Sequence, residues 1–229
     1  MNMFNLFNSF ITKIKGEEFR IDSKVPYSYM VSLLISNILR LVKGYTIFRK
    51  SSRAFISYQS RIICRKMISF GDNLRIDRGV FIDALSINGI SFGKNVSIGK
   101  YTTIECSGTI QNIGVGLIVG NNVGMGTHGY WGCAGGIKVG DDTIFGNYVS
   151  LHSENHFYKS TTMPIRLQGV EREGISIGRN CWIGAKVTIL DGVIIEDGCI
   201  IAAGSVLVRV VYKKNSIYGG IPAKFLKER

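Results

Sequence analysis

The chain has 229 residues and a net charge of +12, and 45% of its residues are hydrophobic. Its five cysteines form neither a Cys-x-x-Cys pair nor a zinc-finger spacing, and no secretory leader is recognisable, so we expect reduced thiols and a cytoplasmic location. No nucleic-acid recognition motif accompanies the basic charge, which argues against a nucleic-acid partner.

The basic charge is concentrated at the N-terminus. Residues 1–66 contain 12 of the 28 Lys and Arg but only 3 of the 16 Asp and Glu, and we expect them to form a partly helical arm. Within this arm, Tyr29–Val42 is the most apolar stretch. We expect it to be too short, and too interrupted by Asn37 and Arg40, to span a bilayer.

Residues 29–53 combine an apolar helical face with basic residues that follow it. Two interpretations fit this pattern. The helix packs on the rest of the chain or on a neighbouring subunit, or it makes a peripheral contact with the anionic inner face of the membrane.

A six-residue period runs from about Phe70 to Leu207. An aliphatic or aromatic residue is followed by Gly or another small or acidic residue, and a small or β-branched residue stands four places after the first. The period is clearest in residues 92–104, 139–151, 177–189 and 195–207. Hexapeptide periodicity is typical of a parallel β-helix in which three hexads form one coil. We therefore predict an all-β domain over residues 67–211 and a tail over residues 212–229.

The hexad also predicts which side chains enter the core. The first and fifth residues should point inward, while the second lies near a corner where Gly fits best. Cys181 and Cys199 both occupy the fifth place, one coil apart, so we expect them to stack inside the helix.

The period is interrupted at several points, and each interruption predicts a loop. The longest loop should cover about residues 156–174. All three histidines, His128, His152 and His156, lie at or beside these interruptions. His156 ends the hexad that begins at Leu151, directly before the long loop.

These repeats, the His before a protruding loop and the tail sequence Gly219-Gly-Ile-Pro-Ala-Lys224 resemble the hexapeptide-repeat acyltransferases. Over about residues 68–229 the chain is similar to O-acetyltransferases of sugars and bacterial surface polysaccharides, relatives of the maltose and galactoside acetyltransferases. The resemblance implies a left-handed β-helix, a homotrimer with active sites between subunits, and acetyl-CoA as co-substrate. It implies direct acetyl transfer, within a ternary complex, to a sugar hydroxyl in O-antigen or capsule synthesis.

The same resemblance implies that His156 is the general base, a role that imidazole chemistry suits near neutral pH. Glu154 is a candidate to orient His156, although it could equally face solvent. Three residues are candidates for acceptor binding: His128, His152, which replaces a corner Gly, and Asn155, which we expect to point inward.

The C-terminal repeats and the tail resemble the segments that bind the cofactor in this family. The implied cofactor-binding residues are Trp182, Ala185, Ala203, Lys224 and Lys227. The two lysines would bind the phosphates of CoA, which require cations or amides, and the tail would lie over the cofactor slot.

Several alternatives remain open at the level of sequence. The chain could be a nucleotide-amino-sugar N-acetyltransferase or an antibiotic acetyltransferase, because the same base serves both nucleophiles. A non-enzymatic β-helix scaffold would not require His156 or the tail sequence. The spacing of the three histidines differs from that of the three-histidine zinc sites of β-helical carbonic anhydrases, so we expect no metal.

Overall fold

A computed structural model describes residues 21–22 and 24–229, so residues 1–20 and 23 of the expected arm lie outside the described residues. The chain divides into two compact units, residues 1–39 and 40–229, and the boundary falls within helix α2 (Tyr27–Phe48). Every strand of the described residues lies in the larger unit.

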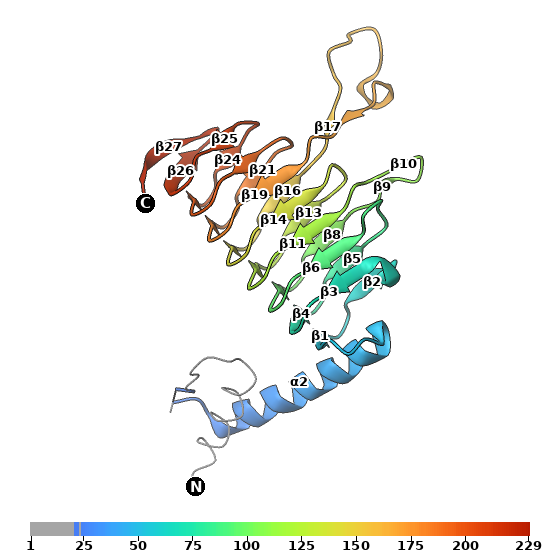
Figure 1. Ribbon diagram of the computed structural model, residues 1–229, viewed down its shortest axis with the longest axis vertical. Coiled ribbons are helices and arrows are strands. Elements are labelled where there is room, and N and C mark those ends of the chain that lie inside the picture. Colours follow the sequence, from blue (N-terminus) through green and yellow to red (C-terminus); the bar gives the residue numbers. More distant parts are fainter. Residues whose placement is uncertain (1–20, 23) are drawn as a thin grey trace. The chain divides into compact units, whose positions relative to one another are not determined.

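Three mainly parallel sheets form the walls of a coiled prism (Figure 1). Sheet A contains β1 (Ala54–Ile56), β4 (Leu74–Ile76), β7 (Ser97–Ile98), β12 (Gly124–Met125), β15 (Ile144–Phe145), β20 (Trp182–Ile183), β23 (Ile200–Ile201), β26 (Ser216–Gly220) and β27 (Ala223–Glu228). Sheet B contains β2 (Arg61–Ile63), β5 (Phe81–Asp83), β8 (Thr103–Glu105), β13 (Tyr130–Gly132), β16 (Ser150–His152), β21 (Thr188–Ile189) and β24 (Val206–Leu207). Sheet C contains β3 (Ile68–Phe70), β6 (Ile90–Phe92), β11 (Leu117–Val119), β14 (Ile137–Val139), β19 (Ile175–Ile177), β22 (Ile194–Ile195) and β25 (Val211–Tyr212).

The chain visits sheets A, B and C in turn, and strands of successive coils pair in parallel, while the last strand, β27, pairs antiparallel with β26. This topology confirms the predicted all-β, left-handed parallel β-helix. Side chains along the strands alternate between buried and exposed, so a single apolar core runs through the coils. Cys181 and Cys199 are both buried in adjacent coils, since the next residues, Trp182 and Ile200, are paired. Their predicted stacking is confirmed.

The three corners of the prism differ in length. Turns from sheet A to sheet B and from sheet C to sheet A have three or four residues, whereas every long connection leaves from sheet B towards sheet C. We call this third edge the B–C corner. Its insertions are residues 84–89, 106–116 and 153–174, and the last two contain the antiparallel pairs β9 (Gly108–Thr109) with β10 (Asn112–Ile113) and β17 (Asn155–His156) with β18 (Val170–Glu171). A 3-10 turn, η2 (Ile165–Leu167), lies in the loop between β17 and β18.

The tight turns place a left-handed residue at the same point of successive coils. Between sheets C and A these residues include Asn73, Asn95 and Asn122, each with φ near +60°. Each of these amides donates a hydrogen bond to the next coil, the last one to Asp142, at 2.9 Å per bond. Asn tolerates this conformation better than most residues, so the ladder explains why Asn recurs in the hexads.

The first coil begins earlier than residue 67. β1 and β2 lie inside the expected arm and pair in parallel with β4 and β5, and a 3-10 turn, η1 (Arg65–Met67), leads into β3. In this coil Ile56 and Ile62 are followed by Ser57 and Ile63 and not by Gly, so the Gly-containing hexad did not predict β1 and β2.

Helix α2 has 22 residues, and its most apolar 18-residue segment has a mean hydropathy of 1.3 and is 11% buried. By its length and its composition, the helix could cross a membrane. The expectation that the stretch is too short was wrong, because the helix continues past Lys43 and Gly44 through Tyr45-Thr-Ile-Phe48. Core helices of soluble proteins and signal sequences share this length and hydropathy.

The end of α2 packs on the first coils. Phe48 contacts Phe70 with ring centroids 4.7 Å apart, and Lys43 donates a hydrogen bond to the Ser57 carbonyl at 2.7 Å. Other basic residues of this segment also contact the coils: Arg40 pairs with Asp77, Lys50 bonds to the Ile68 carbonyl, and Arg53 pairs with Asp72. These contacts favour the interpretation in which this segment packs on the β-helix.

Candidate active site

The candidate site lies at the B–C corner, where the insertion of residues 153–174 leaves the prism. Ser153 begins the insertion and is fully buried. Its hydroxyl accepts a hydrogen bond from the Gly135 amide at 2.9 Å and donates one to the Gly132 carbonyl at 2.8 Å. A side chain at Gly135 would overlap the Ser153 carbonyl, so Gly is required there. Ser153 thus fixes where the loop departs.

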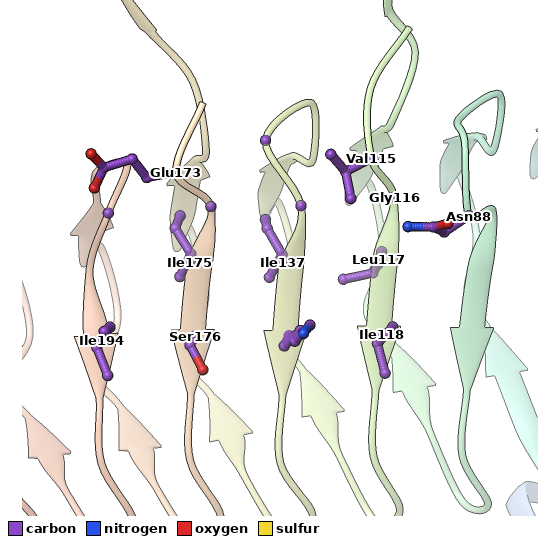
Figure 2. A pocket seen from close by; sticks show the side chains of 15 residues that line it. Asn88, Val115, Gly116, Leu117, Ile118, Ile137, Glu173, Ile175, Ser176 and Ile194 are labelled. Atoms are coloured by element: carbon purple, nitrogen blue, oxygen red, sulfur yellow. The ribbon is translucent and has the colours of Figure 1, made fainter. Parts of the chain in front are cut away.

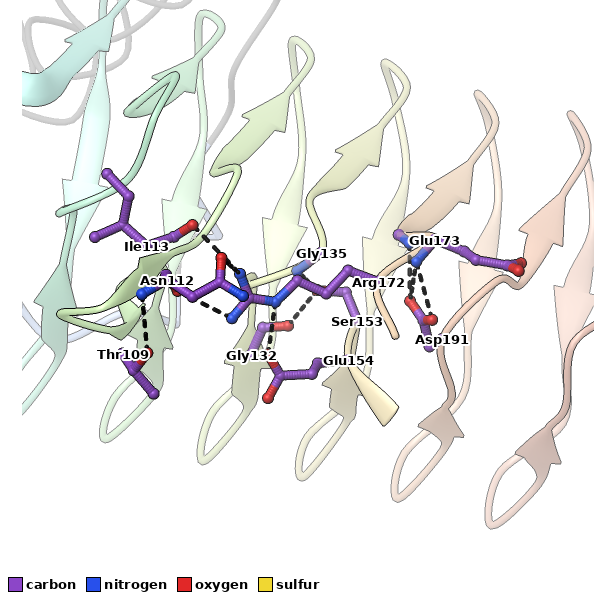
Figure 3. Close-up of polar contacts among 11 residues, drawn as sticks. Thr109, Asn112, Ile113, Gly132, Gly135, Ser153, Glu154, Arg172, Glu173 and Asp191 are labelled. Carbon is purple, nitrogen blue, oxygen red and sulfur yellow. Dashed lines mark hydrogen bonds and ion pairs between the residues drawn. The ribbon is translucent and has the colours of Figure 1, made fainter. Parts of the chain in front are cut away.

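Arg172 holds the other end of the insertion (Figure 3). Its guanidinium forms a salt bridge to Glu154 at 2.7 Å, and only 13% of the Arg172 side chain is exposed. The same group donates to the Asn112 side chain at 3.0 Å, and to the carbonyls of Asn112 and Ile113 at 3.1 and 3.3 Å. Arg172 therefore joins two of the three B–C insertions, at the base of the long loop and at the β9–β10 hairpin.

His156 lies on the ribbon formed by β17 and β18, where it pairs with Val170. Its side chain is exposed. The Glu154 carboxylate is engaged by Arg172, so the expected orienting bond between Glu154 and His156 finds no support in this geometry. Asn155 is exposed and pairs with Glu171, so its predicted inward position is wrong. The hexad ends at Ser153, and the chain then turns into the antiparallel ribbon.

His152 lies beside a polar cavity of about 300 Å³ on sheet B. Tyr130 donates a hydrogen bond to Glu105 at 2.9 Å, and its ring centroid is 5.4 Å from that of His152. Partial burial and the Glu105 carboxylate raise the pKa of Tyr130 to about 12. Partial burial also lowers the pKa of His152, which favours the neutral imidazole. The cavity walls also include Ser107 and Glu154.

A second cavity, of about 410 Å³, lies on the sheet C side of the same corner (Figure 2). Apolar side chains of Val115, Ile118, Ile137, Ile175 and Ile194 line much of it, and Glu173 is at one edge. The ribbon carrying His156 thus leaves the prism near both cavities, since Ser153 lines the first and Gly174 the second.

His128 is at a different edge from His152 and His156. It occupies the turn from sheet A to sheet B with φ of +56°. Its ring stacks on Tyr148 at 4.8 Å and lies 5.2 Å from Tyr101, with all three residues on successive coils. Within one chain, the structure does not bring His128 together with the other two histidines.

The five residues expected to bind the cofactor lie on sheet A and the turns beside it. Trp182 is exposed on β20, and Lys224 and Lys227 are exposed on β27 of the same sheet. Ala185 and Ala203 lie in the following turns towards sheet B. The fold thus groups residues that are separated by more than 40 positions in sequence, and it places them away from the B–C corner.

No group of three or more His, Cys, Asp or Glu side chains among the described residues is arranged to hold a metal ion. Sequence reasoning missed Arg172, Tyr130 and Glu105. The available signal was the second hexad position on sheet B, where Glu105 and His152 stand in place of Gly. These two positions need no small residue because the chain continues from each into a long insertion and makes no tight turn there.

Known proteins that are similar to this chain are named as transferases. Residues 174–209 match the family of bacterial transferase hexapeptide repeats. WbbJ of Escherichia coli K12, named as a lipopolysaccharide biosynthesis O-acetyl transferase, is 28% identical over 168 residues, which cover 70% of this chain and 71% of WbbJ. Rv3034c of Mycobacterium tuberculosis, named as an acetyltransferase, is 29% identical over 73% of this chain, and the match spans about half (52%) of its own length.

Among solved structures, a variant of AntD, an N-acyltransferase from Bacillus cereus, superposes with a TM-score of 0.54. The superposition covers 82% of this chain and 88% of AntD at 19% sequence identity, which shows a shared fold. That crystal contains coenzyme A and dTDP-4-amino-4,6-dideoxyglucose.

Proposed function

We propose a function from the premise that this chain belongs to the bacterial hexapeptide-repeat transferases. The chain is an acetyl-CoA-dependent O-acetyltransferase that acts on a sugar hydroxyl during synthesis of a bacterial surface polysaccharide, O-antigen or capsule. The observation that carries the proposal is the exposed His156, presented on a ribbon whose base is fixed by Ser153 and Arg172. The similarity to WbbJ supports a polysaccharide acceptor.

His156 acts as the general base. Its imidazole accepts the proton of the acceptor hydroxyl while that oxygen attacks the thioester carbonyl, and the resulting imidazolium returns the proton to the departing thiolate. Acetyl-CoA supplies the activated acyl group. Because both substrates are held together in one cleft, transfer is direct and no acyl-enzyme forms.

Sheet A offers the binding surface for acetyl-CoA. Ile144, Trp182 and Ile200 are neighbours on its outer face and form an apolar stripe suited to the pantetheine arm. At the C-terminal edge of the same sheet, Lys224 and Lys227 are exposed and suit the phosphates. The residues present therefore fit the co-substrate.

A complete site requires two chains. Trp182 lies on sheet A, whereas His156 lies at the opposite B–C corner of the same prism. We propose a homotrimer in which His156 of one chain faces the Trp182 surface of its neighbour. His128, near that surface, would contribute to acceptor binding from the neighbouring chain.

The test is calorimetric binding of acetyl-CoA followed by turnover. The double variant Lys224→Ala/Lys227→Ala should bind acetyl-CoA at least about tenfold more weakly, since each lost charge-assisted bond is worth about 1.5–3 kcal/mol. The matched control Lys138→Ala, a lysine on sheet C, should bind normally. His156→Ala should bind acetyl-CoA normally but lose roughly 10²–10⁴ in rate with a sugar acceptor. Full turnover by His156→Ala would refute the assigned base.

The second candidate is N-acylation of an amino sugar, which the AntD structure favours. A paired screen of hydroxyl sugars and nucleotide-linked amino sugars separates the two reactions. Acetylation of amines alone would replace the O-acetyltransferase assignment.

We further propose a cytoplasmic location with peripheral contact at the inner face of the membrane through α2. Leu39, Val42 and Ile38 of this helix are more than half exposed, whereas the neighbouring basic residues contact the coils. The contact would therefore be apolar, and flotation with anionic liposomes should persist at high salt. Absence of flotation at low salt would exclude this contact.

A further inference from the structure

We propose that the cavity on sheet B, lined by Glu105, Tyr130, His152 and Glu154, is the subsite that binds the acceptor as a neutral hexopyranose unit. This inference rests on the proposed function. We call this cavity the sheet B cavity.

The register of three strands creates the space. Gly132 on β13 lies between Glu105 on β8 and His152 on β16, because it is paired with both. A Cβ atom at Gly132 would lie 3.2 Å from the Tyr130 ring and 3.5 Å from its hydroxyl. The Tyr130 ring therefore covers Gly132 and becomes the floor between a carboxylate and an imidazole.

The chemistry of the walls suits hydroxyl groups. Glu105 and Glu154 offer carboxylate oxygens as acceptors, and the Tyr130 ring offers an apolar surface for the C–H face of a sugar. His152 supplies a ring nitrogen on the facing strand. The volume, about 300 Å³, is at the lower end of the range for small-molecule sites, about 300–1,000 Å³, which suits one sugar unit.

The charge of the walls selects against anions. Arg172 is engaged by Glu154, and Glu105 has no cation within salt-bridge distance among the described residues. The sheet B cavity thus carries net negative charge, which disfavours a uronate or phosphate within it.

The position of the cavity also suits the reaction. Glu154 lines the cavity and precedes His156 by two residues, which an extended chain covers in about 7 Å. A sugar bound in the cavity, or the next unit of the same glycan, would then lie beside His156.

The probe is a panel of neutral methyl hexopyranosides, with the corresponding methyl hexuronides as the anionic comparison, measured by saturation-transfer-difference NMR. Gly132→Val, which fills the cavity, should weaken binding of the best neutral glycoside at least about tenfold, and Tyr130→Phe several-fold, in line with loss of one hydrogen bond. The matched control is Gly124→Val on the adjacent strand of the same coil. A Cβ atom at Gly124 has no neighbour closer than 3.8 Å, so glycoside binding should be unchanged.

Two results would overturn the inference: equal glycoside binding by wild type and Gly132→Val, or no binding by any neutral glycoside to a protein that binds acetyl-CoA. Acetyl-CoA binding is measured on all four proteins. If the wild-type protein binds the glycoside but not acetyl-CoA, the proposed function is refuted and the sugar subsite remains supported. Tyr130→Phe keeps the test decisive if Gly132→Val does not fold.

Discussion

Arg172 shows how one side chain can fix the base of the loop that carries His156. Its guanidinium satisfies the Glu154 carboxylate and two carbonyls of the β9–β10 hairpin at once. Removing it would leave a half-buried carboxylate and two carbonyls without their partner, which costs more than the loss of one isolated bond.

We expect Arg172→Met to lower the free energy of unfolding by about 1–3 kcal/mol and to loosen the β17–β18 ribbon. Hydrogen exchange should show faster exchange of the Phe157 amide, which donates to the Gly169 carbonyl, and of the other amides bonded between β17 and β18. Arg166→Met, an exposed arginine within the same loop, is the matched control. Indistinguishable exchange in the two variants would mean that Arg172 does not anchor the loop.

Tyr130 should titrate late among the ten tyrosines. Its folded pKa is raised to about 12, so the unfolded chain releases this proton first as the pH rises. The native state is therefore stabilised below about pH 10, the usual value, and loses this contribution as the pH rises towards 12. The difference in tyrosinate absorbance between wild type and Tyr130→Phe should show one group ionising near pH 12; ionisation near pH 10 would contradict the described environment.

At the scale of elements, the hexad period predicted the coils well because it is a local steric rule. An inward residue followed by a small corner residue is needed wherever a tight turn packs closely against the next coil. Ile56 and Ile62 of the first coil are followed by Ser57 and Ile63, and the insertions leave the prism, so β1, β2 and the insertions could not be read from the period.

The candidate site was predictable only in part for the same reason. His156 was identifiable because it directly precedes the loop. The partners of Arg172 could not be found, since Asn112 lies 60 residues away in sequence and the fold alone brings the two together. Likewise, the cavity beside His152 depends on Gly132 of the preceding coil, and no local pattern records that pairing.

The junction between α2 and β1 gives a second prediction at this scale. Ala is normally favoured over Gly in a helix by about 1 kcal/mol. At Gly44, however, a Cβ atom would overlap the carbonyl of Ala54. Gly44→Ala should therefore destabilise the protein by about 1–3 kcal/mol, whereas Ser32→Ala, at an exposed helical position, should stabilise slightly. Urea denaturation of both variants measures the difference, and a stabilising Gly44→Ala would show that the helix end does not pack on β1.

At the scale of the whole molecule, each prism carries half of the proposed reaction machinery on sheet A and half at the B–C corner. A protein with this division cannot complete a site by itself, because the core of the prism lies between the two halves. Assembly then becomes a condition of activity, and the trimer would set the distance between base and co-substrate.

Mixing two inactive variants tests this arrangement. His156→Ala and Trp182→Ala trimers, unfolded and refolded together in equal amounts, should recover up to about a quarter of wild-type activity, since random assembly pairs an intact base with an intact Trp182 surface at one site in four. Each variant refolded alone is the control. No recovery by well-folded mixed trimers would place the whole site within one chain.

The unequal corners of the prism have a consequence for how such enzymes diversify. Two edges are locked into short turns by contact with the neighbouring coils, whereas the third carries insertions of 6, 11 and 22 residues (84–89, 106–116 and 153–174). Loops at that edge can be lengthened, shortened or exchanged without disturbing the surface that we assign to the common co-substrate. New acceptor preferences could therefore arise by grafting a single insertion onto an unchanged scaffold, a route equally open to protein engineering.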